Sequence, residues 1–433
     1  MRFKIRIIYY FLKFRLHRKQ LFSKKKLEQS RQKLTKKWRQ NLSQSDYYQS
    51  FKNESLNDFP IIAKAEFMEN FDAMNTVGIT KKAALDIALK SEQTRDFSPM
   101  INGITIGLSS GTTGNKGIFL ANEKERAMWV AAVLDRVIGL ELRKRKVAFF
   151  LRANSNLYES VGSSLLQFRF FDIKAEMSEN TDELIAFEPH ILVAQPSVLR
   201  EIAIEYATRK IANLPEKVIS VAEVLEDEDK RFFEQVFQQK IHQVYQCTEG
   251  FLAATCEVGN LHFNEDFLVI EKHYLDENKK RFHPIITDLN RFSQPIIRYE
   301  LNDIIHEGEP CKCGRKSMTI EKIEGRSDDV FRFKNKNNII PIFPDFIRRA
   351  VIMASDEITF YTVIQRSDSA IDCYLEISKK ANKQIIQNKV KTNFEDLFNT
   401  FKLSYPTICF LDDYAIEKGQ KLRRVLVQKT ATD

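Results

Sequence analysis

The stretch Leu108-Ser109-Ser110-Gly111-Thr112-Thr113-Gly114-Asn115-Lys116-Gly117 interleaves three glycines with four hydroxyl side chains. Glycine lets a loop turn its backbone N–H groups toward one point, and such groups bind phosphate together with neighbouring hydroxyls. A tight turn between strands is the alternative, although a turn seldom needs so many hydroxyl groups. The stretch therefore predicts a polyphosphate-binding loop, with Lys116 near the β- and γ-phosphates. It lacks the Gly-Lys-Ser/Thr ending of the common nucleotide-binding loop.

The chain that follows this loop alternates short apolar runs with helical patterns. A helix is predicted over residues 123–140, and Pro196 suits the first turn of another that runs to residue 212. Strands are predicted at residues 146–151, 191–194, 217–222, 241–245, 283–287 and 295–299. Strands separated by helices are typical of an α/β body. From residue 327 the pattern changes, and strands at 359–364 and 371–377 with helices at 344–354 and 383–398 predict a second domain.

Length and composition limit the class of protein. A chain of 433 residues is too long for one compact core. Its 33 Phe and 13 Tyr exclude a disordered chain, and the longest early apolar run, residues 7–12, is far below the roughly 20 residues that span a bilayer. Six cysteines in so long a chain do not indicate a disulfide scaffold, which favours a reducing cytoplasm.

The positive charge is concentrated at the N-terminus. Residues 1–40 carry a net charge of +14, with Glu28 as their single acid, so the remaining chain carries −5. This arm alternates basic with bulky apolar residues. We weigh three interpretations: a helix docked on the body, a helix lying on an anionic membrane surface, and contact with nucleic acid through Lys24, Lys25 and Lys26. The last is disfavoured because no stacking aromatics interleave that run, and we expect no nucleic-acid partner.

Further motifs follow the loop in a fixed order. They are Val221-Ala222-Glu223, Tyr245-Gln246-Cys247-Thr248-Glu249, Ile297-Arg298-Tyr299-Glu300-Leu301-Asn302-Asp303, Gly325-Arg326-Ser327-Asp328-Asp329 and Gly419-Gln420-Lys421-Leu422-Arg423-Arg424-Val425. Together with SSGTTG, this set resembles the motifs of the adenylate-forming superfamily, which includes acyl-CoA and aryl-CoA ligases. Cys311-Lys312-Cys313-Gly314-Arg315 resembles the phenylacetate-CoA ligase and deazaflavin-adenylating synthetase branch. Gln246 stands where that family usually has glycine.

The resemblance implies a fold and a division into domains. The expected fold class is α/β, with a large adenylation domain of several subdomains and a smaller, mobile α+β C-terminal domain. The expected boundaries are a basic helical arm at 1–40, an ATP- and acid-binding domain at 41–326, and a small domain at 327–433 that carries the catalytic lysine. Asp328 is the expected hinge.

The resemblance also assigns roles to single residues. Lys421 would stabilise the charge that develops on the α-phosphate, Thr248 would bond that phosphate, and Glu249 would hold Mg²⁺. ATP would be bound by Ser109, Ser110, Gly111, Thr112, Thr113, Gly114 and Lys116 at its phosphates, by Ala222, Glu223 and Tyr245 at adenine, and by Asp303 and Arg326 at the ribose or phosphate.

Three cysteines and one histidine form a candidate metal site. Cys256 and His262 lie close in sequence, and Cys311 and Cys313 follow about fifty residues later. Three thiols and one imidazole make a closed tetrahedral set, which is typical of structural Zn²⁺. Buried free cysteines are the alternative.

The predicted function is ATP-dependent adenylation of a carboxylic acid with release of pyrophosphate, followed by transfer of the acyl group to a thiol. That thiol would belong to coenzyme A or a carrier protein. Two rivals are an adenylyltransferase that places AMP on an acceptor hydroxyl, and a non-catalytic membrane-associated scaffold. The acid cannot be read from the sequence, because its pocket walls, which we expect to include Arg152, Asn154, Tyr158 and Ser220, follow no motif. The expected location is the cytoplasm. If the arm binds a membrane surface, the protein would be attached peripherally to that membrane.

Overall fold

The computed structural model describes residues 2–94, 96–109, 117–139, 141, 143–151, 166–173, 175–336, 338–378, 380–414 and 421–428. The chain forms two compact units. The larger is Met1–Leu301 with Ile305–Ile323, and the smaller is Asn302–Ile304 with Glu324–Asp433. The arm therefore belongs to the larger unit, and Asp303 belongs to the smaller one.

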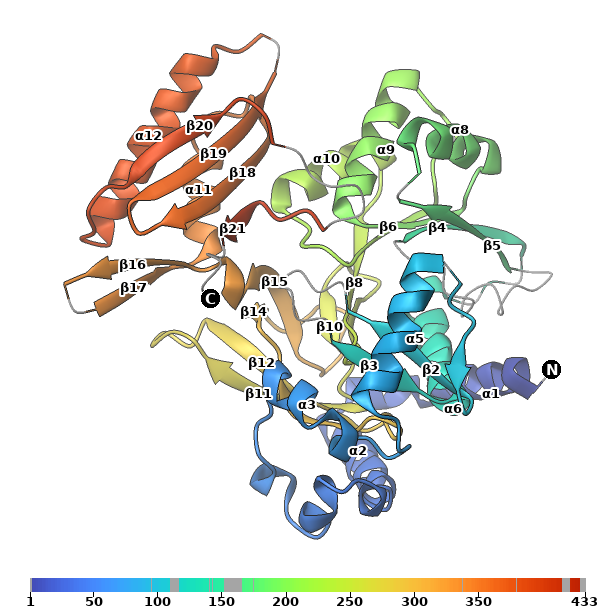
Figure 1. The fold of residues 1–433 in the computed structure, drawn as a ribbon. Helices are drawn as coiled ribbons and strands as arrows, with labels where there is room; N and C mark the ends of the chain where they lie inside the picture. The colour runs from blue at the N-terminus through green and yellow to red at the C-terminus, as the bar shows by residue number, and fades with distance from the viewer. Residues whose placement is uncertain are drawn as a thin grey trace. The chain divides into compact units, whose positions relative to one another are not determined.

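The larger unit is built on a long mixed sheet (Figure 1). One half is parallel, with strand order β8-β7-β6-β4-β5. These strands are β4 (Arg145–Leu151), β5 (Leu166–Asp172), β6 (Ile191–Ala194), β7 (Lys217–Val221) and β8 (Ile241–Gln246). Helices α8 (Met177–Phe187), α9 (Pro196–Arg209) and α10 (Asp227–Phe237) connect them. All four residues of β6 are buried, because a central parallel strand is covered on both faces.

The other half of the sheet is antiparallel and runs from β8 outward. It contains β9 (Phe251–Thr255), β10 (Leu261–Phe263), β11 (Leu268–Tyr274), β12 (Arg281–Asp288), β13 (Ile296–Glu300), β14 (Asp303–Glu307) and β15 (Thr319–Arg326). A separate antiparallel sheet holds β1 (Met100–Ile101), β2 (Ile104–Leu108) and β3 (Ile118–Ala121) in that order. Helices α3 (Lys64–Glu69), α4 (Phe71–Met74) and α5 (Lys81–Thr94) precede this sheet, and α6 (Glu123–Val133) follows it.

The N-terminal arm forms α1 (Arg2–His17) and α2 (Lys24–Arg39). The docked-helix interpretation is confirmed, because Ile7 of α1 is buried against Ala127, Val130 and Ala131 of α6. The buried carboxylate of Asp135, just beyond α6, forms ion pairs with Arg15 at 3.0 Å and Arg18 at 3.4 Å. Among the helices that the structure describes, none has the length and apolar character needed to cross a membrane.

The smaller unit has its own core. A four-stranded sheet has the order β20-β19-β18-β21, and a hairpin pairs β16 with β17. These elements are β16 (Phe331–Asn335), β17 (Asn338–Ile342), β18 (Ile358–Ser367), β19 (Ala370–Ile377), β20 (Thr407–Leu411) and β21 (Val425–Val427), with helices α11 (Pro344–Ile352) and α12 (Lys383–Thr400). Pro344 opens α11 as predicted, because a first helical residue needs no N–H donor.

One predicted helix differs in the structure. The pattern over 123–140 predicts a single helix, but α6 ends at Val133 and a π-helical turn continues over Leu134–Ile138. Gly139, at φ 78°, then ends the helical segment. Two carbonyl groups of this turn accept hydrogen bonds from side chains of the large sheet. The carbonyl of Val137 accepts from Lys217 Nζ, and that of Ile138 accepts from Arg145.

We predict that two adjacent residues of α1 differ sharply in their effect on stability. Ile7 is 3% exposed and Ile8 is 59% exposed. Ile7→Ala removes packed methyl groups and should lower the free energy of unfolding by about 2–4 kcal/mol, whereas Ile8→Ala should change it by less than about 0.5 kcal/mol. Urea unfolding of both variants checks this. Equal effects would show that α1 does not pack through Ile7.

Candidate active site and metal-binding cluster

The predicted phosphate loop connects two strands of a hairpin. Ser109 N–H donates to the carbonyl of Gly117 at 2.8 Å, and Gly117 N–H donates to Ser109 Oγ at 2.6 Å. Ser109 thus closes the base of the loop between β2 and β3. The other predicted phosphate contacts lie outside the described residues: Ser110, Gly111, Thr112, Thr113, Gly114 and Lys116. So do the pocket-wall candidates Arg152, Asn154 and Tyr158, whereas Ser220 is buried in β7.

The Thr248-Glu249 motif forms the turn between β8 and β9. Cys247 and Gly250 close this turn with reciprocal backbone hydrogen bonds of 3.0 and 3.3 Å. Thr248 Oγ1 donates to Glu249 Oε2 at 2.8 Å, and both side chains are half-buried. Tyr245 is buried at the end of β8, with its ring 6.3 Å from that of Phe263. The turn therefore presents a carboxylate and a hydroxyl side by side.

A buried arginine joins this turn to the strand that leaves the phosphate loop. Arg291 Nη1 donates to the carbonyl of Thr248 at 3.2 Å, and Nη2 donates to the carbonyl of Leu120 in β3 at 3.3 Å. Gln294 completes the link, because it bonds Arg291 Nη2, Leu120 N–H and the carbonyl of Ile118. The sequence gives no sign of this role, since Arg291 and Gln294 lie in an ordinary polar stretch before a predicted strand.

A buried glutamate fixes the segment that carries Arg291. Glu125, at the start of α6, accepts hydrogen bonds from Phe292 N–H, Ser293 N–H, Ser293 Oγ and Asn122 N–H. Trp129, one turn further along α6, donates from Nε1 to Gln246 Oε1 at 3.3 Å. Helix α6 thus contacts both the Arg291 segment and the end of β8, and the glutamine found in place of glycine at 246 makes the second contact.

The predicted adenine contact contains a strained turn. Ala222 has φ 69°, and Glu223 N–H bonds the carbonyl of Val221 at 2.9 Å, which closes a three-residue turn. Non-glycine residues rarely adopt this conformation, and such strain is frequent at functional sites. The Glu223 carboxylate accepts from Ser197 N–H at 3.0 Å and Ser197 Oγ at 3.1 Å, so it caps α9.

Arg298, in the predicted Arg-Tyr segment, has a structural role. Its guanidinium pairs with both carboxylate oxygens of Glu271, at 3.0 and 2.8 Å, and donates to the carbonyl of Phe59 at 2.6 Å. Tyr299 is buried beside it and its backbone bridges to Ile62. These contacts attach residues 59–62, which follow the arm, to the large sheet.

The smaller unit brings the two predicted ribose ligands together. Arg326 Nε lies 3.4 Å from Asp303 Oδ1. Beside them, Asp328 accepts from Asn302 Nδ2 at 3.4 Å, and Asp329 forms an ion pair with Arg423. Burial raises the pKa of Asp329, while the positive charge of Arg423 opposes that shift. Lys421 is half-buried two residues before Arg423, so this unit holds Asp303, Arg326, Asp328 and Lys421.

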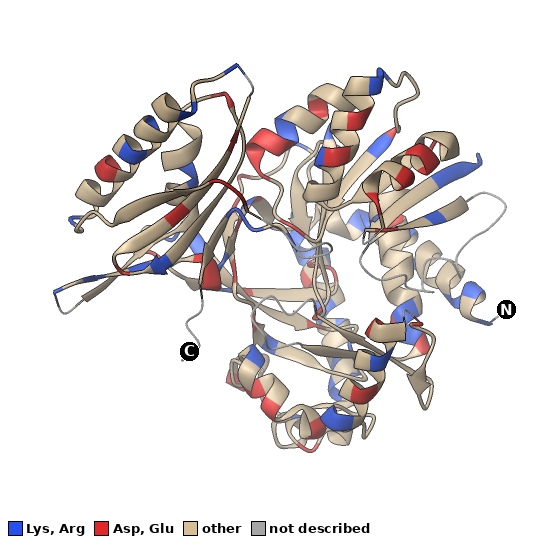
Figure 2. Ribbon diagram, turned by 45° about the horizontal axis from the view of Figure 1, so that its top comes forward, with Lys and Arg blue, Asp and Glu red and all other residues tan. Residues whose placement is uncertain are grey.

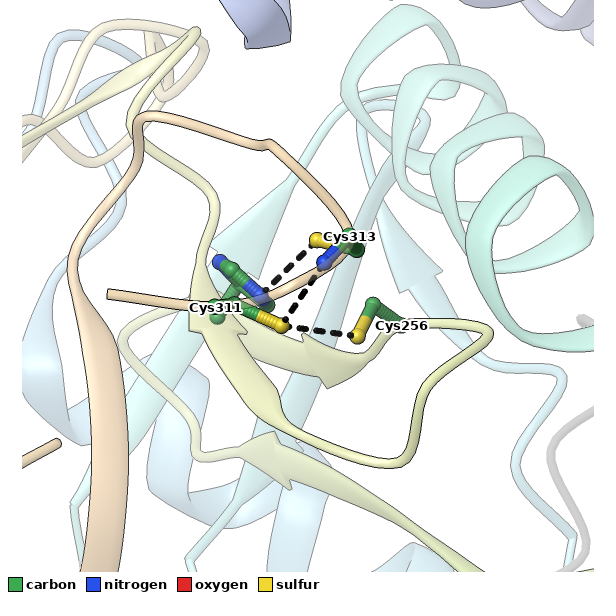
Figure 3. A group of neighbouring side chains, drawn as sticks. Cys256, Cys311 and Cys313 are labelled. Atoms are coloured by element: carbon green, nitrogen blue, oxygen red, sulfur yellow. Dashed lines mark hydrogen bonds between the residues drawn. The ribbon is translucent and has the colours of Figure 1, made fainter. Parts of the chain in front are cut away.

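The four predicted metal ligands meet in one cluster. Figure 3 shows its three cysteines close together. One ligand atom each from Cys256, His262, Cys311 and Cys313 lies within 4.8 Å of the others. Cys256 Sγ and Cys311 Sγ are 3.7 Å apart, and Cys313 Sγ is 3.5 Å from His262 Nε2. A tetrahedral ion with metal–sulfur bonds of about 2.3 Å would separate two sulfurs by about 3.8 Å. The 3.7 Å separation of Cys256 Sγ and Cys311 Sγ therefore matches the sulfur–sulfur spacing of a tetrahedral metal site.

The surroundings of the cluster orient its histidine. His262 Nδ1 lies 3.2 Å from the carbonyl of Ser317 and 3.3 Å from Ser317 Oγ. The tautomer with its proton on Nδ1 would donate to that carbonyl and leave a lone pair on Nε2 for a metal. Asn260 Nδ2 donates to Cys311 Sγ at 3.2 Å, and Arg315 N–H donates to Cys313 Sγ at 3.5 Å. Donors to sulfur stabilise thiolates, which are the form that binds metal.

Comparison with known proteins identifies the fold. No protein-family model and no curated protein matches the sequence. The structure is similar to 2-hydroxyisobutyryl-CoA ligase in the postadenylation state in complex with 2-HIB-AMP, with a TM-score of 0.68 and 15% identity over 95% of this chain and 90% of that chain. It is also similar to amide bond synthetase McbA from Marinactinospora thermotolerans, with a TM-score of 0.54 and 11% identity over 74% of this chain and 68% of that chain. The same 2-hydroxyisobutyryl-CoA ligase with 2-HIB-AMP and CoA in the thioesterification state gives a TM-score of 0.53 at 17% identity, over 94% of this chain and 90% of that chain.

The predicted α/β fold of adenylate-forming ligases, with a smaller C-terminal unit, is thereby confirmed. The phenylacetate-CoA ligase and deazaflavin-synthetase branch stays a prediction.

We predict that Asp288, next to Arg291, makes stability fall as pH rises. The carboxyl is buried, and burial raises its pKa to about 7 against the attraction of Arg291. In the unfolded chain an aspartate titrates near 3.9. The native state therefore binds this proton more tightly, and the free energy of unfolding should fall between about pH 4 and pH 7, by a few kcal/mol at most.

Asp288→Asn should remove that fall, because an amide oxygen can still accept from Asn290 N–H, as Oδ1 does at 2.8 Å. Urea unfolding at several pH values compares this variant with wild type and with Asp86→Asn, a control at an exposed carboxylate. Parallel pH profiles for wild type and Asp288→Asn would contradict the assignment.

Proposed function

We propose that this protein adenylates a carboxylic acid with ATP, releases pyrophosphate, and transfers the acyl group to the thiol of coenzyme A. The observation that carries the proposal is the link through Arg291. It holds the Thr248-Glu249 turn and the exit strand of the phosphate loop against one guanidinium. A carboxylate-bearing turn held beside the strand that leaves the predicted phosphate loop suits a nucleotide triphosphate with its Mg²⁺.

The residues at the β8–β9 turn fit the metal and the α-phosphate. Glu249 offers carboxylate oxygen, which Mg²⁺ prefers, and Thr248 holds one of its oxygens through the 2.8 Å hydrogen bond. Bound Mg²⁺ would neutralise phosphate charge. When ATP is bound, the Thr248 hydroxyl would turn from Glu249 and donate to the α-phosphate. The strained turn at Ala222 would offer its backbone to adenine, because the Glu223 side chain is engaged with Ser197. Asp303 and Arg326 would act at the ribose and phosphate.

The proposed first step joins two anions. The substrate carboxylate oxygen attacks the α-phosphorus, and the bond from that phosphorus to the oxygen bridging the α- and β-phosphates breaks, which releases pyrophosphate. Charge accumulates on the non-bridging oxygens, so positioned cations provide most of the catalysis. Lys421 is the proposed catalytic cation for this step, with Asp328 as the hinge of the unit that carries it.

In the proposed second step, the thiol sulfur attacks the acyl carbon and AMP leaves. Solved structures of 2-hydroxyisobutyryl-CoA ligase with 2-HIB-AMP and CoA, which share this fold, favour a thiol over a hydroxyl as the acceptor. A carrier-protein thiol would follow the same chemistry.

We also propose that the Cys256–His262–Cys311–Cys313 cluster holds structural Zn²⁺. The set is closed, because its four ligands leave no position for substrate. Its ligands come from the end of β9, from β10 and from the segment before β15. The ion would therefore fasten three segments of the sheet.

We predict one Zn²⁺ per chain, measured by elemental analysis of protein purified without added metal. Cys311→Ser should lower both the metal content and the melting temperature, because metal binding is coupled to folding. Cys373→Ser is a control for loss of a buried thiol, since Cys373 lies in the core of the smaller unit. Metal-free wild-type protein of unchanged stability would contradict the zinc assignment.

Pyrophosphate release from ATP, measured with fatty, aryl and keto acids with and without coenzyme A, tests the function. We predict that Lys421→Ala lowers pyrophosphate release at least a hundredfold, on the order of 3 kcal/mol of lost transition-state stabilisation. Reaction of a supplied acyl-adenylate with coenzyme A should be largely retained, because this lysine acts on the α-phosphate in the first step.

Lys389→Ala, at an exposed position of α12, is the matched control and should keep both activities. Equal loss of both half-reactions in Lys421→Ala would argue against its assigned role. An adenylated product without free AMP would instead indicate transfer of AMP to a hydroxyl.

A further inference from the structure

Helix α1 is apolar on two opposite faces. Its inner face packs on the body through buried Ile7 and the partly buried Phe3, Tyr10, Phe11 and Phe14. Its outer face leaves five large apolar side chains in solvent: Ile5 58% exposed, Ile8 59%, Tyr9 60%, Leu12 51% and Leu16 79%. Their spacing of three and four residues places them on one side of the helix. We name these five residues the outer stripe.

Basic side chains border the outer stripe along both edges. With 3.6 residues per turn, Lys4 and Arg15 fall at one edge, and Arg2, Arg6 and Lys13 fall at the other. Figure 2 shows Lys and Arg in blue on this helix. Arg6 and Arg15 also reach Glu123 and Asp135 of the body, at 3.1 and 3.0 Å. The cations at the edges of the stripe therefore lie beside exposed apolar surface.

We propose that the outer stripe lies on an anionic lipid surface, with the axis of α1 parallel to that surface. The apolar side chains would enter the boundary between headgroups and acyl chains, and the bordering cations would contact the phosphates. This inference is independent of the proposed enzymatic activity. The charge distribution supports it, because an anionic surface attracts an arm of +14 and repels the remaining chain of −5. The two effects together turn α1 toward the lipid.

The same charges disfavour other occupants of the stripe. A second copy docked through its own α1 would bring two sets of basic edges together, with Glu28 as the single acid of each arm. A spanning helix is ruled out for α1, because its 16 residues are too few and carry several charges. The amphipathic arrangement suits a surface helix, whose polar flanks stay in the headgroup layer.

Co-sedimentation with lipid vesicles tests the proposal with the full-length protein. Truncation is unsuitable, because it would also remove Ile7 from the core and leave Asp135 buried without its arginines. The protein should bind vesicles of phosphatidylcholine mixed with phosphatidylserine and not vesicles of phosphatidylcholine alone. Binding should weaken as salt is added.

Surface substitutions separate the apolar contribution to vesicle binding from the electrostatic one. Ile8→Glu combined with Leu12→Glu should lower vesicle binding at least about tenfold, because it removes apolar contact and adds negative charge. Arg2→Gln and Lys13→Gln should each lower it about fivefold at low salt. Ile204→Glu, at an exposed apolar position of α9, is the matched control and should bind as wild type does. Pyrophosphate release on a soluble acid should be unchanged in all of these variants.

Three outcomes would overturn the proposal. One is the absence of binding to phosphatidylserine vesicles at low salt. Another is equal binding by wild type and by the Ile8→Glu, Leu12→Glu variant, which would place the contact elsewhere. The third is concentration-dependent self-association that the double substitution abolishes, seen by analytical ultracentrifugation without lipid, because that result would identify a second copy as the occupant.

Discussion

The guanidinium of Arg291, buried together with the carboxylate of Glu125, is the constraint on which the candidate site depends. A charge removed from water is tolerated only when hydrogen bonds replace its hydration. Arg291 has the carbonyls of Thr248 and Leu120 as acceptors, and Glu125 has the backbone donors of Phe292 and Ser293. Displacing these backbone partners would leave a buried charge without its hydrogen bonds and would cost folding free energy. Local bonds between Cys247 and Gly250 close the Thr248-Glu249 turn, and the long-range bonds of Arg291 fix its position against β3.

The Cys256–His262–Cys311–Cys313 cluster lies at the opposite end of the same strand. β9 runs over only five residues, Phe251–Thr255, from the turn held by Arg291 to Cys256 of the cluster. His262 lies on β10, which pairs with β9 on one side and with β15 on the other. Since β15 ends at Arg326, the cluster joins the strand beside the Thr248-Glu249 turn to the strand that leads into the smaller unit. A structural ion there would stiffen both connections.

The sequence predicts those parts of this architecture that depend on local chemistry. Residues 191–194 form the buried strand β6 because a short apolar run suits a strand covered on both faces, and Pro196 opens α9 because it needs no N–H donor. The grouping of Cys256, His262, Cys311 and Cys313 is predictable because thiols and imidazole have few alternative uses as a set. Arg291, Gln294 and Glu125 could not be found in this way, because their partners lie some 170 residues away in the chain. Glu223 is a similar case. Its motif predicts a contact with adenine, whereas in the structure its carboxylate caps α9.

Helix α6 connects the arm with the candidate site. Its small residues Ala127 and Ala131 permit the close approach of Ile7, whereas Glu125 and Trp129 of the same helix contact the Arg291 segment and Gln246. Small side chains on the face of α6 toward α1 leave room for the larger side chains on the inner face of α1. The arm is thus an integral layer of the larger unit, and its alternating sequence reflects two apolar faces rather than one. The inner face packs against α6. At the borders of the outer face, Arg6 and Arg15 also tie the helix to the body through Glu123 and Asp135.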